Sequence, residues 1–97
     1  MNEILTLVNK TEENTSVRDV FCRLASIGQK EFYQAHAVDF HPEIKFVLAD
    51  YLDYEGEKLV IYSEQWYRVI RTYRAGQELE IVVEKAAAED VEADLHG

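Results

Sequence analysis

The sequence predicts an all-β protein: a small six-stranded β-barrel or sandwich with one long insert loop that carries a short helix. Three observations support this class. Apolar residues make up 47% of the 97 residues and aromatic residues 11%, which is enough for a single packed core. Short segments of alternating apolar and polar residues follow one another between turn residues, as in small barrels and sandwiches. One differently patterned segment, residues 29–46, interrupts them, and such inserts commonly carry function.

The first two strands are expected at residues 4–8 and 17–27. The wholly polar stretch 10–16 between them has the composition of a hairpin loop. The second segment alternates in the way of a half-buried strand, because every second side chain points to the same face. Its apolar face would hold Val20, Cys22 and Leu24.

Residues 29–46 form the predicted insert. Ser26 stands three residues before Gln29, the spacing of a capping box, and the residues up to Val38 include neither Gly nor Pro. Pro42 pushes the residue before it toward extended geometry, so a helix of one or two turns would end ahead of it. The residues at helical spacing in this stretch are Phe32, Tyr33 and His36.

Four further strands are expected at residues 43–48, 59–62, 66–73 and 78–84, separated by turn residues. Their close succession favours a barrel or sandwich over a βαβ architecture. The predicted core residues are Val20, Leu24, Phe46, Leu48, Ile61, Ile70, Ile81 and Val83.

The domain is expected to span residues 1–85, with the insert at 29–46. Past Lys85 the composition changes, because residues 86–97 hold four acidic residues and only two bulky apolar ones. This composition predicts an acidic, flexible C-terminal tail outside the core.

The formal net charge of −9 argues against a nucleic-acid groove, because phosphate binding depends on clustered Lys and Arg. The single cysteine, Cys22, excludes an intrachain disulfide and fits a reducing compartment. No apolar stretch is long enough for a membrane span, and the N-terminus lacks the features of a signal peptide. We therefore expect no membrane partner and synthesis in the cytoplasm.

We expect no catalytic activity, no bound metal and no other cofactor. His36, Asp39 and His41 are the only metal-like constellation, but their spacing matches no standard zinc pattern. Cys22 alternates with apolar residues, which is typical of a buried small hydrophobe and not of a nucleophile. The sequence contains neither a Gly-rich phosphate loop nor a serine nucleophile elbow.

Several segments together resemble a known family in their order and spacing. They are Val20-Phe21-Cys22-Arg23-Leu24, Gln29-Lys30-Glu31-Phe32-Tyr33-Gln34-Ala35, Pro42-Glu43 with Phe46, Asp53-Tyr54-Glu55-Gly56-Glu57-Lys58 and Tyr67-Arg68-Val69-Ile70-Arg71-Thr72-Tyr73. Across roughly residues 4–85 the chain resembles the head-closure proteins of tailed phages, also called head-tail joining or stopper proteins. The chain departs from that family in its acidic C-terminus and at Ser63-Glu64-Gln65, where relatives often carry a glycine turn.

The resemblance implies a structural virion protein of a phage or prophage. Copies of it would form a ring, twelvefold by the resemblance, beneath the portal and adaptor complex of the head. The ring would seal the DNA channel and offer a docking surface to a tail completion protein, with packaged DNA only as blocked cargo. It would lie in the host bacterial cytoplasm during assembly and then in the virion neck.

Two groups of candidate site residues follow. The resemblance makes the insert a mobile plug for the axial channel, and its candidate residues are Gln29, Glu31, Phe32, Tyr33, His36, Phe40 and His41. The only basic concentration, on the strand at 66–73 and the turn after it, is a candidate subunit interface formed by Arg68, Arg71 and Arg74. The alternative for this group is three ordinary solvated side chains.

The charges of the insert agree with a plug, because residues 29–46 contain three acidic residues and only two lysines. A basic plug would bind the DNA phosphates that it must release. Copies of one loop around an axis could pair backbone to backbone and close the opening. The simpler interpretation is that Phe32, Tyr33 and Phe40 pack a surface helix onto the mouth of the barrel.

A competing hypothesis is a monomeric, OB-like binding module for an oligonucleotide or peptide, since such modules share this architecture. Its signature would be exposed aromatic residues interleaved with Lys and Arg on one sheet face. Tyr67, Arg68, Tyr73 and Arg74 come closest, and the net charge of −9 argues against them.

Overall fold

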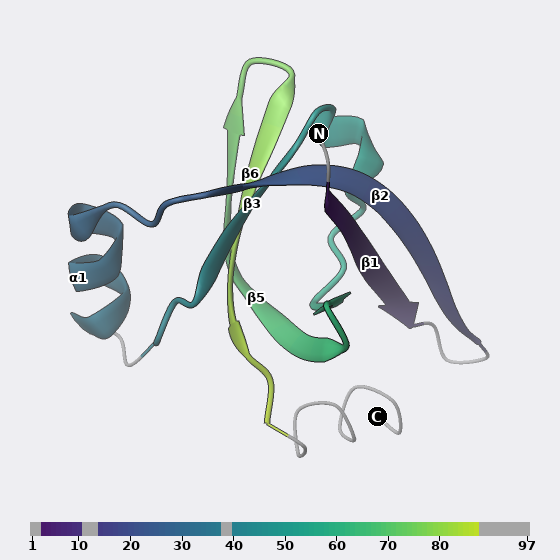
Figure 1. Ribbon diagram of the computed structural model, residues 1–97, viewed down its shortest axis with the longest axis horizontal. Helices are drawn as coiled ribbons and strands as arrows, with labels where there is room; N and C mark the ends of the chain where they lie inside the picture. Colours follow the sequence, from purple (N-terminus) through teal and green to yellow (C-terminus); the bar gives the residue numbers. More distant parts are fainter. Residues whose placement is uncertain (1–2, 11–13, 38–39, 88–97) are drawn as a thin grey trace.

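The computed structural model describes residues 3–10, 14–37 and 40–87. Six antiparallel strands close into a barrel in the order β1-β2-β3-β6-β5-β4 (Figure 1), so the predicted all-β barrel is confirmed. The strands are β1 (Glu3–Lys10), β2 (Thr15–Ala25), β3 (Ile44–Leu48), β4 (Leu59–Tyr62), β5 (Gln65–Ala75) and β6 (Glu78–Lys85). The helix α1 (Gln29–Ala37) lies between β2 and β3, and the 3-10 helix η1 (Tyr51–Asp53) follows β3.

The hairpin between β4 and β5 is as tight as the sequence predicts. Ser63 and Glu64 both have positive φ values, 50° and 66°. A two-residue turn with two positive φ values matches the right-handed twist of the flanking strands, although glycine and asparagine adopt it with less strain. Gly76, with φ 64°, turns the chain between β5 and β6.

The core lies inside the barrel. Four of the predicted core residues, Phe46, Leu48, Ile81 and Val83, are fully buried there, and the ring of Phe46 meets that of Tyr62 edge to face at 5.1 Å. Among the described residues, the inner cluster consists of Leu5, Leu7, Cys22, Phe46, Leu48, Val60, Tyr67, Leu79, Ile81 and Val83.

The prediction was wrong for Leu24, which is 46% exposed, although Cys22 on the same face is buried. Leu24 pairs with Phe46 of β3, but the pairing of β1 with β2 ends at Cys22 opposite Glu3. Within the described residues, Leu24 therefore has a strand on one side only. Val20 is partly buried and packs against the core.

Ile61 and Ile70 are also only partly buried, for two different reasons. Ile61 alternates with the fully buried Val60, so it belongs to the outer face of β4. Ile70 lies at a β-bulge in β5, because Val69 pairs with Val83 and Arg71 pairs with Val82. The extra residue of a bulge has no partner on the neighbouring strand.

Cys22 is buried in the core, as predicted. Burial raises the pKa of its thiol to about 11, and the negative charge of Glu3 adds to the effect. A thiol with a raised pKa stays protonated at neutral pH, and the thiol is a poor nucleophile compared with the thiolate.

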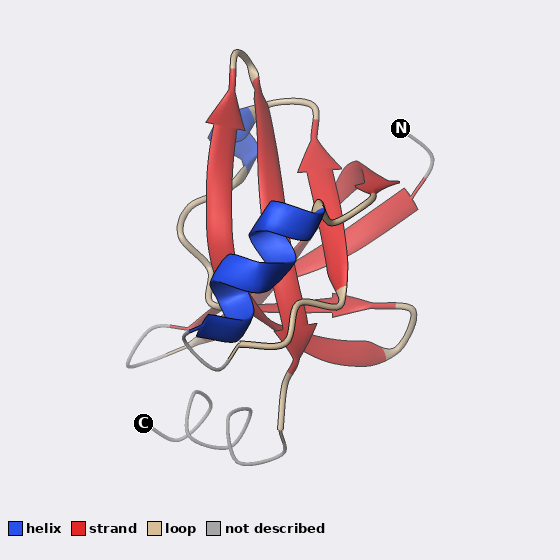
Figure 2. Cartoon of the chain, turned by 90° about the vertical axis from the view of Figure 1, so that its left-hand side faces the viewer, coloured by secondary structure: helices blue, strands red, loops and turns tan. Residues whose placement is uncertain are grey.

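A second apolar layer lies on the outside of the barrel. Val47 and Val82 are buried, although they alternate with core residues and so point away from the barrel interior. Figure 2 shows α1 lying across the outer face of β3, β6 and β5, on this side of the barrel. On the same face Lys45 is nearly buried and lies 3.3 Å from Glu80, measured from Nζ to Oε1.

The segment predicted as the insert contains the expected helix, but its limits differ. The helix α1 begins at Gln29, later than a capping box at Ser26 would place it. Residues 44–46 belong to β3, because the side chain of Phe46 fills the core. We therefore use "the insert" below for residues 26–43, the segment that joins β2 to β3.

A buried carboxylate holds the loop after η1 against β2. The side chain of Glu57 is 2% exposed; its Oε1 lies 3.1 Å from Arg18 Nη2, and its Oε2 accepts a hydrogen bond from the Glu55 N–H. Tyr54 donates its hydroxyl hydrogen to the Glu57 carbonyl at 2.6 Å. Burial, with the charge of Glu57, raises the pKa of Tyr54 to about 12.

The predicted C-terminal tail falls mostly outside the described residues, which end at Ala87. The Ala86 N–H donates to the Trp66 carbonyl at 3.2 Å, so the chain is still attached to β5 just after β6 ends. Among the residues that the structure describes, no helix has both the length and the apolar character to cross a membrane.

Candidate functional site

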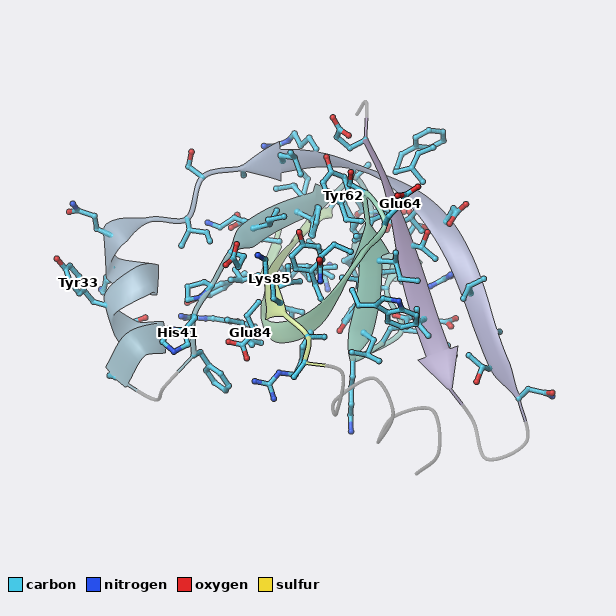
Figure 3. All side chains as sticks on the ribbon, turned by 60° about the horizontal axis from the view of Figure 1, so that its bottom comes forward. Tyr33, His41, Tyr62, Glu64, Glu84 and Lys85 are labelled. Atoms are coloured by element: carbon cyan, nitrogen blue, oxygen red, sulfur yellow. The ribbon has the colours of Figure 1, made fainter. Side chains whose placement is uncertain are left out.

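The two predicted groups of site residues, one in the insert and one on β5, lie in contact with each other. Side chains of β5 and β6 reach the insert at two places, one near its end and one in the middle of α1. Figure 3 shows His41 beside Glu84, whereas Tyr33 points away from the barrel on the far side of α1. The sequence patterns gave no sign that these groups meet.

The first contact, the Glu84 anchor, fixes the end of the insert. Glu84 Oε2 accepts a hydrogen bond from the His41 backbone N–H at 2.8 Å, while Oε1 forms an ion pair with Arg68. The Arg68 guanidinium also lies 5.6 Å from the centroid of the Phe40 ring. Because the Glu84 side chain is only 10% exposed, its charge depends on these partners for stabilisation.

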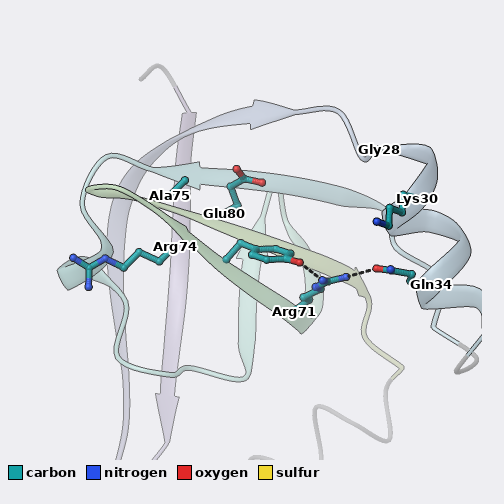
Figure 4. A pocket seen from close by; sticks show the side chains of 8 residues that line it. Gly28, Lys30, Gln34, Arg71, Arg74, Ala75 and Glu80 are labelled. Atoms are coloured by element: carbon teal, nitrogen blue, oxygen red, sulfur yellow. Dashed lines mark hydrogen bonds between the residues drawn. The ribbon is translucent and has the colours of Figure 1, made fainter.

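The second contact, the Arg71 anchor, fixes the middle of α1. Arg71 Nη1 donates to Gln34 Oε1 at 3.1 Å, and Nη2 donates to the hydroxyl of Tyr73 (Figure 4). The guanidinium lies 4.3 Å from the centroid of the Tyr73 ring. All three side chains are partly or fully exposed, so water competes with this contact and its contribution to stability is small.

The β-bulge at Ile70 decides which arginines share a face. Arg68 pairs with Glu84 and Arg71 with Val82, and both point to the outer face, although they are three positions apart. Arg74 pairs with Leu79, an inner residue, and its guanidinium lies 3.5 Å from the centroid of the Tyr51 ring. The three predicted interface arginines therefore do not form one surface.

A pocket of about 450 Å³ opens beside the Arg71 anchor. It lies between the first turns of α1, which contribute Gly28, Lys30 and Gln34, and the outer side of β5 and β6. Figure 4 shows Lys30, Gln34 and Arg71 around this space, with Arg74 pointing away from them. Most of the residues that line it have polar or charged side chains, and the carboxylate among them, Glu80, is the one paired with Lys45.

The remaining predicted plug residues have different surroundings. Tyr33 is 69% exposed, and Gln29 is exposed at the first position of α1. Phe40 is partly buried under Arg68. The side chains of Glu31, Phe32 and His36 are not described, and Asp39 lies outside the described residues. Within the described ranges, no group of three His, Cys, Asp or Glu residues could hold a metal ion.

Glu84 and Gln34 were missed as site residues. In the sequence, Glu84 alternates with Val83, which is typical of an outward-pointing, solvated strand residue. Its direction was correct, but the insert covers it. No pattern within β6 could indicate this, because its partner His41 lies 43 residues away in the sequence.

We expect the substitution Glu84→Gln to loosen the end of the insert. The loss of the charge weakens the Arg68 pair and the hydrogen bond from His41, at a cost of about 1–3 kcal/mol in the free energy of unfolding. Urea denaturation would measure this cost, and amide hydrogen exchange would show faster exchange at His41. The control is Glu78→Gln on the same strand, whose partner Arg23 is 50% exposed and whose loss should cost less than about 1 kcal/mol. Equal effects of the two substitutions would contradict the anchor.

No protein-family model matches the chain, and a search of curated proteins finds no match. The assignment of function therefore depends on the residues and their geometry.

Proposed function

We propose that this chain is a non-enzymatic structural protein of a tailed phage or prophage, a head-closure protein. In this proposal its copies form a ring under the portal and adaptor complex, seal the DNA channel with their inserts, and present the surface to which a tail completion protein attaches. The observation that carries the proposal is a closed six-stranded barrel whose helical insert lies outside the core and is held by polar contacts.

A plug must change position without unfolding its scaffold. Among the residues whose side chains the structure describes, the core cluster contains none from the insert, so the barrel meets this requirement. The anchors on the insert are an ion pair with a hydrogen bond at Glu84 and a partly exposed hydrogen bond at Arg71. Contacts of this kind can be exchanged for similar contacts on a neighbouring subunit at a small cost in free energy.

The charge of the chain also supports a channel seal that does not bind DNA. The net charge is −9, and four of the basic side chains are paired with carboxylates of the barrel. These cations are Arg18, Arg23, Lys45 and Arg68. A surface of this kind repels phosphate and lets DNA pass once the plug opens.

The structure places two of the residues that the competing binding-module hypothesis needs on the surface in other surroundings. Tyr67, one of the aromatic residues it needs for base or peptide stacking, is 8% exposed and belongs to the core cluster. Arg68 next to it is paired with Glu84. Tyr73 and Arg74 remain exposed on this strand, and Tyr73 lies beside Arg71.

We expect the free chain to be monomeric or weakly associated and to form a ring only on a symmetric template, because its charge of a single sign is self-repelling. Light scattering of the purified full-length chain should give the monomer mass. Electron microscopy after mixing with portal and adaptor complexes should then show a ring of added density. A tight dimer that is unchanged by the portal complex, or the absence of added density, would contradict the proposal.

A further inference from the structure

The pocket beside α1 differs in its charge from the rest of the barrel surface. Lys30 and Arg71 both line it, and within the described part of the chain neither has a carboxylate partner. Arg71 uses two of its five N–H groups, on Gln34 and Tyr73, so further donors remain for an acceptor. The N-terminal end of α1, with its unpaired N–H groups, adds partial positive charge to the same side.

These cations lie in a chain with almost twice as many acidic as basic residues, 19 against 10. Glu80, which also lines the pocket, is paired with Lys45 and does not neutralise them. A concave site in which two cations have no carboxylate partner among the described residues fits an acidic segment, because both charges can then be satisfied at once.

The chain itself contains such a segment. Residues 89–94 hold four carboxylates and no basic residue. The acidic positions are Glu89, Asp90, Glu92 and Asp94.

The course of β6 favours the pocket of another copy over the chain's own pocket. Glu80 lines the pocket, whereas Lys85 at the end of β6 pairs with Tyr67 at the beginning of β5. At about 3.4 Å per residue, the chain has moved roughly 17 Å away from Glu80 along the sheet when it leaves β6. A segment that follows at this end reaches a neighbouring molecule without having to turn back over its own strand.

We propose that the pocket lined by Lys30 and Arg71 binds the acidic segment 89–94 of a second copy of this chain. The contact joins two different surfaces, so it can repeat from one copy to the next and close into a ring. It rests on the proposed function, since it names the contact between neighbouring subunits of the head-closure ring. It also assigns a role to the C-terminal residues, which the resemblance leaves without one.

The test is cross-linking of the full-length chain by a carbodiimide, which joins a lysine amine to a carboxylate only when the two are in direct contact. Equal amounts of ¹⁴N-labelled and ¹⁵N-labelled chain are mixed, both free and in the presence of portal and adaptor complexes, and cross-linked peptides are identified by mass spectrometry. We expect peptides that join Lys30 to residues 89–94 with mixed isotope labels. Arg71→Gln should lower their yield roughly fivefold, as expected for the loss of one ion pair, whereas Lys58→Gln should leave the yield unchanged.

Each other outcome has a defined meaning. Cross-links within single-label molecules alone would show that the segment occupies its own pocket and would overturn the proposal. Absence of the cross-link in both samples, or a yield that does not depend on Arg71, would overturn it as well. If the chain forms a ring on the portal but gives no cross-link, the proposed function is supported and the proposed contact is wrong. If the chain gives the mixed cross-link but does not bind the portal, the proposed contact is supported and the proposed function is wrong.

Discussion

Replacing Ile81 with alanine is expected to lower the free energy of unfolding by about 2–5 kcal/mol. Ile81 is fully buried and lies at the centre of β6, opposite Phe46 on β3 and Thr72 on β5. The substitution removes three buried carbon atoms and leaves a cavity that the closed barrel cannot easily fill. For a domain whose total stability is about 5–15 kcal/mol, this loss is large. Urea denaturation followed by the fluorescence of Trp66 would measure it.

The matched control is Ile70→Ala, the same chemical change in the neighbouring strand. Ile70 lies at the bulge, is partly exposed and does not belong to the core cluster. Its truncation should cost about 1 kcal/mol or less, because much of the removed surface is already in contact with water. If the two variants had the same midpoint of unfolding, the assignment of the inner and outer faces of β5 and β6 would be wrong.

The strands of this fold could be predicted from the sequence, because each has either a period of two or bounding turn residues. All six appear within a few residues of their expected limits. The helix in the insert was also predicted, from the spacing of Phe32, Tyr33 and His36. The helix α1 begins at Gln29, which is the first residue of the predicted insert.

The faces of some strands could not be predicted, for reasons that arise only in three dimensions. Leu24 alternates correctly but lies beyond the described part of the neighbouring strand β1, which begins at Glu3 opposite Cys22. Ile70 has a regular pattern in the sequence, and the bulge that removes its partner is a property of the β5–β6 pairing. Val82 is buried on an outer face, and alternation alone would place it in water.

The candidate site was predicted as two separate groups, and the structure brings them into contact at Arg68 and Arg71. Arg68 and Arg71 were considered for contacts with other subunits, but in this structure they bind Glu84 and Gln34 of the same chain. These contacts join residues that are 16 and 37 positions apart, and they depend on the pairing of β5 with β6 and of β3 with β6. Composition indicated the basic concentration, but only the fold shows its partners.

The substitution Tyr33→Ser is expected to leave the barrel folded and to abolish the proposed sealing of the channel. Tyr33 is suited to a test of the insert that spares the barrel, because its side chain is 69% exposed and points away from the barrel (Figure 3). A change at Phe40, by contrast, would also disturb the Glu84 anchor through Arg68. The midpoint of thermal unfolding should stay within a few degrees of the parent, since a largely exposed side chain contributes little to stability.

The functional effect is measured by complementation of a phage that lacks this protein. If neighbouring inserts close the channel through this side chain, the same contact is lost at every interface of a symmetric ring, so we expect the infectious titre to fall on the order of a hundredfold or more. Heads should fill with DNA and then leak it or fail to receive tails. The control is Leu52→Ser, an exposed apolar residue of η1 outside the insert, which is 66% exposed and should support infection. Full infectivity of the Tyr33 variant, and of a chain in which residues 29–37 are replaced by a Gly-Ser linker, would show that the insert is passive and that the barrel serves only as a spacer between head and tail.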